Sequence, residues 1–270
     1  MITIVEGMLE RWRNHEGKEI EVVHEFMVLT SEMISRTAFG SNYVLGGEEY
    51  NRYDIEDGFH FKLMKTSDDI ESNKLEKVIH DSITGEVENY GNDYLGGLMK
   101  CKTFYFSGYE CTTSLLYWAT LLLATHLDWQ DKARKEVIDL FGHQQSPMII
   151  NESLRLYAPV YSIVRETKKK VRIGKVKLPA NMQFYIPIHP ERFAEGVAKA
   201  TNNNIASFLA FSLAPRSCVD CNFATTEVKV ALSMILQRYR ITLSPVYAHA
   251  PVHLLTIHPA HGLQIILHPI

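Results

Sequence analysis

The sequence predicts a mainly α-helical protein with a small β-sheet region, an α+β fold. Apolar residues recur at helical spacing through most of the chain, whereas a β-rich stretch is confined to residues 162–188. With 270 residues, of which 46% are hydrophobic, the chain is long enough to bury a sizeable core. Length and composition allow one large domain or two small ones.

The helices are predicted from apolar periodicity and from the residues that end them. Gly17 separates the first two, and Gly40 and Gly142 end the second and the fifth. The longest would span about 45 Å at 1.5 Å per residue, enough to cross the interior. The expected helices cover residues 4–14, 23–38, 67–83, 92–126, 128–141, 148–157 and 218–239.

The strands are predicted from short β-rich pieces at residues 171–173, 175–177 and 184–186, which Gly174 and Pro179 interrupt. Residues 254–257 and 264–267 are expected to form a terminal hairpin. The Gly, Tyr and Asp content of residues 41–60 is typical of a loop.

Composition excludes several classes of function. A net charge of −3 gives no electrostatic case for a nucleic-acid partner. Four cysteines without a paired framework favour a reducing compartment. No N-terminal apolar run resembles a signal peptide or a membrane span, and the apolar run 115–124 is too short to cross a bilayer.

The segment Phe211-Ser-Leu-Ala-Pro-Arg216-Ser-Cys218 carries the most informative chemistry. Cys218 is expected where a loop becomes a helix, where unpaired N–H groups and the helix dipole favour a thiolate. Such a thiolate could hold a haem iron, and Arg216 would suit an anionic carboxylate. The alternative interpretation is a small buried residue at a helix start.

Other motifs follow the same chain order. Glu152-Ser-Leu-Arg155 places an acid and a guanidinium three residues apart on a helix that must end near Pro159. With Gly108-Tyr-Glu-Cys-Thr112, Pro190-Glu-Arg-Phe193 and the cysteine segment, the chain resembles the cytochrome P450 family, and its plant members in particular. The resemblance extends from about Gly7 to the end.

The resemblance implies a truncated cytochrome P450 fold, a single domain over residues 1–270. It would bind haem b through Cys218 as the axial iron ligand. Phe211 belongs to the same haem loop, and Arg165 and Arg216 match positions that pair with the haem propionates. A buried structural triad is implied at Glu152, Arg155 and Arg192, where breaking such a buried pair costs about 3–5 kcal/mol.

The resemblance also implies catalytic roles for Glu110, Cys111 and Thr112 in oxygen activation, where an acid and a hydroxyl relay protons. In this chain Cys111 stands at the hydroxyl position, and a thiol is a poor hydrogen-bond donor. Thr112 lies about 100° further round the helix.

The haem loop departs from the family pattern, because Ser212, Ala214 and Asp220 stand where family members carry glycine. A positive φ costs an ordinary residue about 1–2 kcal/mol. Residues 100–101, 146–147 and 189–190 look like joins where internal segments are missing. We also expect that the N-terminal anchor and most of the helices that cover the substrate pocket are missing.

The implied function is a haem-thiolate monooxygenase that inserts one oxygen atom from O2 into a lipophilic small molecule. Its electrons would come from NADPH through an NADPH-cytochrome P450 reductase. The family implies the cytosolic face of the endoplasmic reticulum membrane; a chain without an anchor would be cytosolic. The alternatives are an inactive P450 relic and a helical interaction protein.

Cys218-Val-Asp-Cys221 leaves two further alternatives open, a redox dithiol and half of a zinc site. A structural zinc ion needs four ligands, and His189, His258 and His261 lack the usual spacing for the other two.

Overall fold

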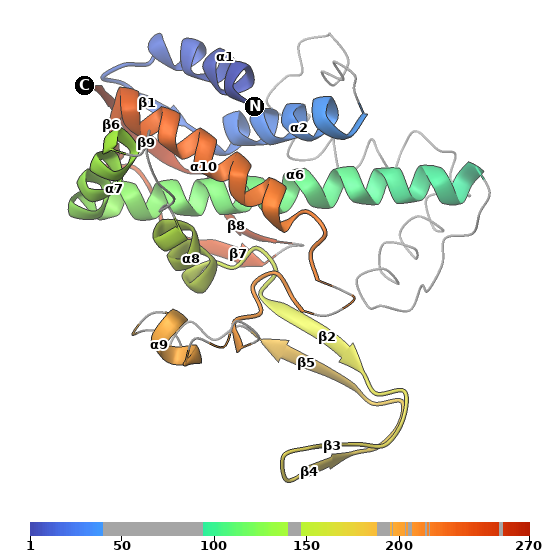
Figure 1. The fold of residues 1–270 in the computed structure, drawn as a ribbon. Helices are drawn as coiled ribbons and strands as arrows, with labels where there is room; N and C mark the ends of the chain where they lie inside the picture. Colours follow the sequence, from blue (N-terminus) through green and yellow to red (C-terminus); the bar gives the residue numbers. More distant parts are fainter. Residues whose placement is uncertain are drawn as a thin grey trace. The chain divides into compact units, whose positions relative to one another are not determined.

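The structure is a computed structural model in which the contacts divide the chain into two compact units (Figure 1). The first comprises residues 1–41, 105–163 and 187–270, and the second comprises residues 42–104 and 164–186. The residues that the structure describes are 1–39, 94–139, 147–187, 195, 197–202, 204, 207–213, 215, 217–253 and 256–270. The predicted loop at 41–60, the predicted helix at 67–83, Gly40 and Gly142 lie outside them. The single domain over residues 1–270 stays a prediction.

The helices agree with the sequence prediction wherever both can be compared. Residues 92–126, predicted as the longest helix, form the 32-residue α6. One short helix, α9, was not predicted. The described helices are α1 Ile2–Arg13, α2 Val23–Phe39, α6 Tyr94–Thr125, α7 Leu127–Asp139, α8 Pro147–Leu156, α9 Val197–Thr201 and α10 Cys221–Arg238.

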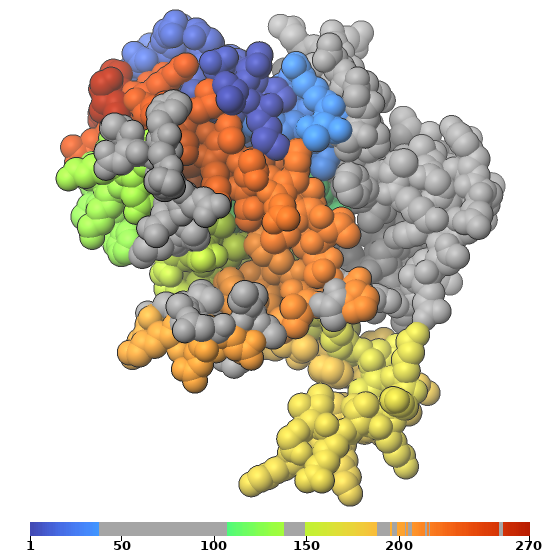
Figure 2. Space-filling view, in the orientation of Figure 1, coloured from blue at the N-terminus to red at the C-terminus, as the bar shows by residue number. Residues whose placement is uncertain are grey.

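Helix α6 runs through the core of the first unit. Every residue from Thr112 to Leu121 is buried, so this stretch is covered on all sides of the helix. Trp12 of α1, Phe26 of α2 and Ile235 of α10 belong to the same apolar core. In the view of Figure 2, α1 and α10 lie at the surface and little of residues 107–125 of α6 can be seen. The interior position predicted for the longest helix is therefore confirmed.

The largest sheet joins three distant segments, β1 Glu19–Glu21, β9 Gln264–Pro269 and β6 Tyr239–Leu243, in the order β1-β9-β6. Both pairings are antiparallel, and Ile265 of the central strand lies opposite Ile20 on one side and Leu243 on the other. Ile265 and Leu267 are fully buried. The sheet thus closes the core at the ends of α1 and α10.

The predicted terminal hairpin is wrong. Strand β9 pairs with β1 and β6, whereas β8 (Ile257–Pro259) pairs with β7 (Pro251–His253). The apolar run of residues 265–267 correctly predicted a strand. Its partners are decided by burial of Ile265 and Leu267 against distant parts of the core, which a local pattern cannot reveal.

The β-rich stretch predicted at residues 162–188 is confirmed. Strand β2 (Ser162–Glu166) pairs with β5 (Gln183–Pro187), and β3 (Val171–Ile173) forms an antiparallel hairpin with β4 (Val176–Leu178). Gly174 has φ 58° in the turn between β3 and β4, a conformation that glycine adopts without strain.

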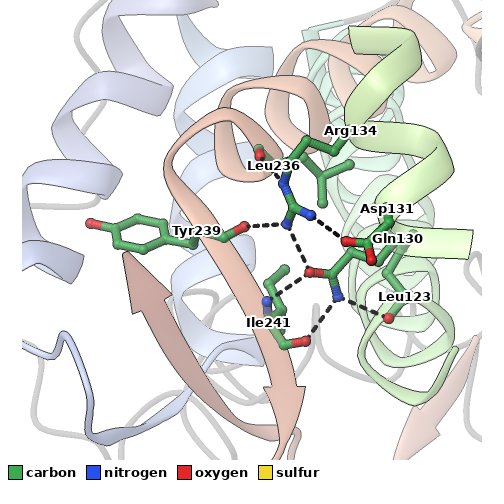
Figure 3. Close-up of polar contacts among 7 residues, drawn as sticks. All are labelled: Leu123, Gln130, Asp131, Arg134, Leu236, Tyr239 and Ile241. Atoms are coloured by element: carbon green, nitrogen blue, oxygen red, sulfur yellow. Dashed lines mark hydrogen bonds and ion pairs between the residues drawn. The ribbon is translucent and has the colours of Figure 1, made fainter. Parts of the chain in front are cut away.

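A buried amide holds α7 against α6 and β6 (Figure 3). Gln130 is fully buried; its Nε2 donates to the carbonyls of Leu123 (3.0 Å) and Ile241 (2.8 Å), and its Oε1 accepts from the Ile241 N–H (2.9 Å). Arg134 donates to the same Oε1 at 3.0 Å and to the Tyr239 carbonyl at 3.0 Å. The buried amide is therefore fully hydrogen-bonded.

Candidate functional site

Residues 211–218 form a loop, here called the cysteine loop, whose two ends are joined by a hydrogen bond. The Cys218 N–H donates to the Phe211 carbonyl at 2.8 Å, and the Ser212 N–H donates to the Leu209 carbonyl at 2.9 Å. Ser212 has φ 59°. One of the three positions where the family carries glycine therefore adopts the left-handed backbone that favours glycine. Ala214 and Arg216 lie outside the described residues.

The Cys218 thiol is exposed and lies before α10 rather than in it. The helix begins at Cys221 with Asp220 as its N-cap, three residues later than predicted. Partial burial raises the pKa of Cys218; the Asp220 N–H, which donates to the sulfur, lowers it, and the Asp220 carboxylate raises it. The prediction that the helix start favours the thiolate is therefore wrong for the free thiol, because burial raises the pKa by more than the Asp220 N–H lowers it.

Asp220 lies beside α6 at Gly108. A Cβ built on Gly108 would lie 2.3 Å from Ile34 Cδ1 and 3.8 Å from Asp220 Oδ2, so the glycine permits close approach by α2. Asp220 Oδ2 is buried and has no hydrogen-bond partner among the described residues, and burial raises the pKa of this carboxyl group. Its φ of −102° suits any residue. The substitution therefore introduces a poorly solvated acid, not backbone strain.

Cys111 and Thr112 occupy different environments on α6. Burial, followed by the charges of Glu110, Cys218 and Asp220, raises the pKa of Cys111 to about 12. Thr112 is 1% exposed, and its Oγ1 donates to the Gly108 carbonyl at 2.8 Å. The Thr112 hydroxyl proton is therefore used within the helix, and Cys111 remains a neutral thiol at physiological pH.

The Glu110 carboxylate is bound by two residues that the sequence analysis did not assign to the site. Glu110 is 6% exposed; its Oε1 accepts a hydrogen bond from Thr256 Oγ1 at 2.9 Å and lies 2.5 Å from His258 Nε2. Thr256 Oγ1 and His258 Nε2 are 2.8 Å apart, so the three side chains form one cluster. His258 was considered only as a zinc ligand, and no local signal could link it to a residue 148 positions away.

A single carbonyl anchors the 256–258 segment to α6. Ser114 Oγ (3.1 Å), the Tyr117 hydroxyl and Trp118 Nε1 (3.0 Å) all donate to the Ile257 carbonyl. Because Ile257 lies between Thr256 and His258, this anchor also positions the two partners of Glu110.

The predicted Glu152–Arg155 pair forms. Arg155 Nε donates to Glu152 Oε2 at 2.8 Å, and Arg155 Nη2 donates to Glu152 Oε1 at 2.5 Å. The Arg155 side chain is 12% exposed, but that of Glu152 is 49% exposed, so the predicted burial is wrong for Glu152. Arg192 lies outside the described residues. Arg165 belongs to the second unit, where its guanidinium donates to the Val164 carbonyl at 2.9 Å.

The described residues fit the thiolate side of a haem site. An exposed thiol on a loop closed by its own backbone is the donor that a single axial ligand requires. Zinc finds less support, because the described ranges contain no cluster of three or more His, Cys, Asp or Glu side chains that could hold a metal ion. Nor does any helix among these residues have the length and apolarity needed to cross a membrane.

Comparison with known proteins gives one family. The cytochrome P450 family profile matches residues 97–259. The chain is 44% identical to "Cytochrome P450 CYP749A22" of Panax ginseng, covering 100% of this chain and 65% of that protein. It is 32% identical to "11-oxo-beta-amyrin 30-oxidase" of Glycyrrhiza uralensis, covering 97% and 64%. A crystal structure of a cytochrome P450 (CYP102L1) superposes with a TM-score of 0.75 at 20% identity, covering 100% of this chain and 73% of that one.

The chain thus spans less than two thirds of the length of these plant relatives. The alignment with the ginseng protein runs over 343 positions, although the chain has 270 residues. The relative therefore has segments, inside the aligned region, that have no counterpart here.

Proposed function

Because this chain belongs to the cytochrome P450 family, we propose that it binds haem b through Cys218 and acts as a monooxygenase on a lipophilic small molecule. The observation that carries the proposal is the exposed Cys218 thiol, held in a loop that the Phe211 carbonyl closes directly before α10. The relatives named as cytochromes P450 and as an 11-oxo-beta-amyrin oxidase support oxidation of a small molecule.

When bound, haem would supply oxygen activation, with a thiolate ligand pushing electron density toward the iron. Cys218 would hold the iron, and Arg165 and Arg216 would pair with the propionates. Phe211 would support the loop through its backbone carbonyl, while Glu152, Arg155 and Arg192 would stabilise the fold behind it. Electrons would come from an NADPH-dependent reductase.

On this proposal Glu110 is the acid of the proton relay on the central helix, and its orientation depends on Thr256 and His258. A general acid must lie within hydrogen-bond reach of the group it serves. The contacts of Glu110 Oε1 all lead to the 256–258 segment. We propose that protons reach the site along this segment rather than through Cys111.

A second candidate is a haem-binding protein without turnover. Three observations favour it: the neutral thiol at Cys111, the internally bonded hydroxyl of Thr112, and the unpartnered carboxyl oxygen of Asp220 beside the cysteine loop. Each weakens proton delivery or thiolate formation, and none prevents haem uptake.

The test is the absorption spectrum of the full chain after haem reconstitution, reduction and exposure to carbon monoxide. A strongly red-shifted Soret band that is lost in Cys218→Ala and kept in Cys221→Ala would support the axial ligand. An unshifted spectrum, or one unaffected by Cys218→Ala, would refute it. Product formation with NADPH and a reductase then separates the monooxygenase from the haem binder.

A further inference from the structure

The β3–β4 hairpin of the second unit carries a dense block of positive charge. Six of the ten residues 168–177 are Lys or Arg, and no acid occurs between Thr167 and Pro190. The remaining 260 residues hold 22 basic and 31 acidic side chains, a net charge of −9 against −3 for the whole chain. The chain therefore concentrates positive charge on one small element.

The hairpin register separates its side chains into two faces. Val171 lies opposite Leu178 and Ile173 lies opposite Val176, and since alternate residues share a face, these four form one apolar face. Arg172 lies opposite Lys177 on the other face. Ile173 is 57% exposed and Val176 is 59% exposed, which leaves an apolar pair uncovered next to the turn.

Five of the six positive charges form no ion pair within the described part of the chain. No carboxylate there forms an ion pair with Lys169, Lys170, Arg172, Lys175 or Lys177, and Arg172 Nε donates only to the Gly174 carbonyl at 3.0 Å. Like charges directly opposite one another destabilise a strand pair. The Arg172–Lys177 pair is thus a cost to the isolated hairpin that an external anion would offset.

The hairpin also has a place where an anionic group can sit. An open depression of about 440 Å³ is lined by Lys170, Arg172 and Lys177, together with Val171, Leu178 and Pro179. Residues of both the cationic and the apolar face therefore contribute to the lining of this depression.

We propose that the β3–β4 hairpin binds the surface of an anionic lipid bilayer, with its cations on the head groups and Ile173 and Val176 in the interface. Five of the six cations are lysines, which specific protein interfaces disfavour, whereas arginine and aromatic residues are enriched there. Clustered lysines suit the diffuse charge of anionic lipids. An exposed apolar pair at a cationic turn matches an interfacial anchor. The proposal does not depend on haem.

The test is flotation of the full chain with vesicles of phosphatidylcholine alone and with about one third phosphatidylserine. We expect binding to the anionic vesicles only, weakened on raising the salt from about 0.05 to 0.5 M because screening shortens the reach of the charges. Each cation contributes roughly fivefold to binding, so Lys169→Gln/Lys170→Gln/Arg172→Gln should lower it about a hundredfold.

The matched control is Lys132→Gln/Lys135→Gln/Lys229→Gln, which removes three exposed lysines of α7 and α10 and should change binding less than threefold. Ile173→Ser/Val176→Ser should weaken binding several-fold and leave its salt dependence unchanged. Equal loss in the two triple variants, or equal binding to neutral vesicles, would overturn the proposal. So would saturable binding of the hairpin to a purified reductase with no binding to vesicles, since that would assign the surface to a protein.

Discussion

Replacing His258 with leucine tests the cluster around Glu110 most directly. The substitution removes the group that lies 2.5 Å from Glu110 Oε1 and leaves Thr256 Oγ1, at 2.9 Å, as the partner of that oxygen. The side chains of His258 and Glu110 are 19% and 7% exposed, so water can replace the lost partner only in part.

These contacts set bounds on how much unfolding free energy the His258→Leu variant should lose. A hydrogen bond to a charged group contributes about 1.5–3 kcal/mol, and breaking a fully buried charge pair costs about 3–5 kcal/mol. Because His258 keeps some exposure and Thr256 remains, we expect His258→Leu to lower the free energy of unfolding by about 2–3 kcal/mol. Urea denaturation followed by far-UV circular dichroism would measure it, with an unchanged m-value showing that the two states are comparable.

Two further variants separate the contact from general effects of losing a histidine. His261→Leu changes an exposed histidine three residues away and should cost less than about 0.5 kcal/mol. In a Glu110→Gln background, His258→Leu should cost about 1–2 kcal/mol less than in the wild type, because no carboxylate is left without its partner. Equal losses for His258→Leu and His261→Leu, or no coupling with Glu110, would refute the reasoning.

Three other predictions concern stability. Gln130→Leu should cost about 3 kcal/mol or more in urea unfolding, because buried backbone groups of Leu123 and Ile241 lose their partner, whereas Gln237→Leu on the exposed side of α10 should be nearly neutral. At position 212, where φ is 59°, the glycine variant should exceed the alanine variant by about 1 kcal/mol in unfolding free energy; equal stabilities would contradict the strain. Burial, and then the Asp220 charge, raises the pKa of Glu227 well above its usual value; since the folded state holds this proton more tightly, stability should fall as the pH rises above the unfolded-state pKa. Glu227→Gln should reduce that fall between pH 5 and 8, and an unchanged slope would count against it.

The helices could be predicted from the sequence because their signal is local. Apolar spacing located α6 and α10 to within a few residues, and Gly174 marked the turn of the β3–β4 hairpin. Short strands were harder, since β1 has three residues and exists through pairing with β9, some 245 residues later. A three-residue strand carries too little alternation to be recognised without its partner.

In the candidate site, too, the residues with a local sequence signal were predictable and those positioned by long-range contacts were not. Motif order identified Cys218, Glu110 and the Glu152–Arg155 pair, because each lies within a short recognisable segment. His258 escaped because its role depends on a strand that the Ile257 carbonyl fixes to α6. The direction of the pKa shift of Cys218 was misjudged because burial of the thiol, which the sequence does not reveal, raises this pKa, and because α10 starts three residues later than predicted.

The two described positions at which the family carries glycine affect the site by different physical routes. At Ser212 the backbone is left-handed, so the cost falls on the turn that sets the approach to Cys218. At Asp220 the backbone is ordinary, but a carboxyl oxygen lies buried and unpartnered beside Gly108, and its charge raises the pKa of both Cys218 and Cys111. Ser212 therefore affects how firmly the loop is held, whereas Asp220 affects how readily its sulfur becomes a thiolate. A glycine at 212 should act on the unfolding free energy and a glycine at 220 on thiol reactivity toward an alkylating reagent, so the two measurements distinguish loop strain from electrostatics at the same cysteine.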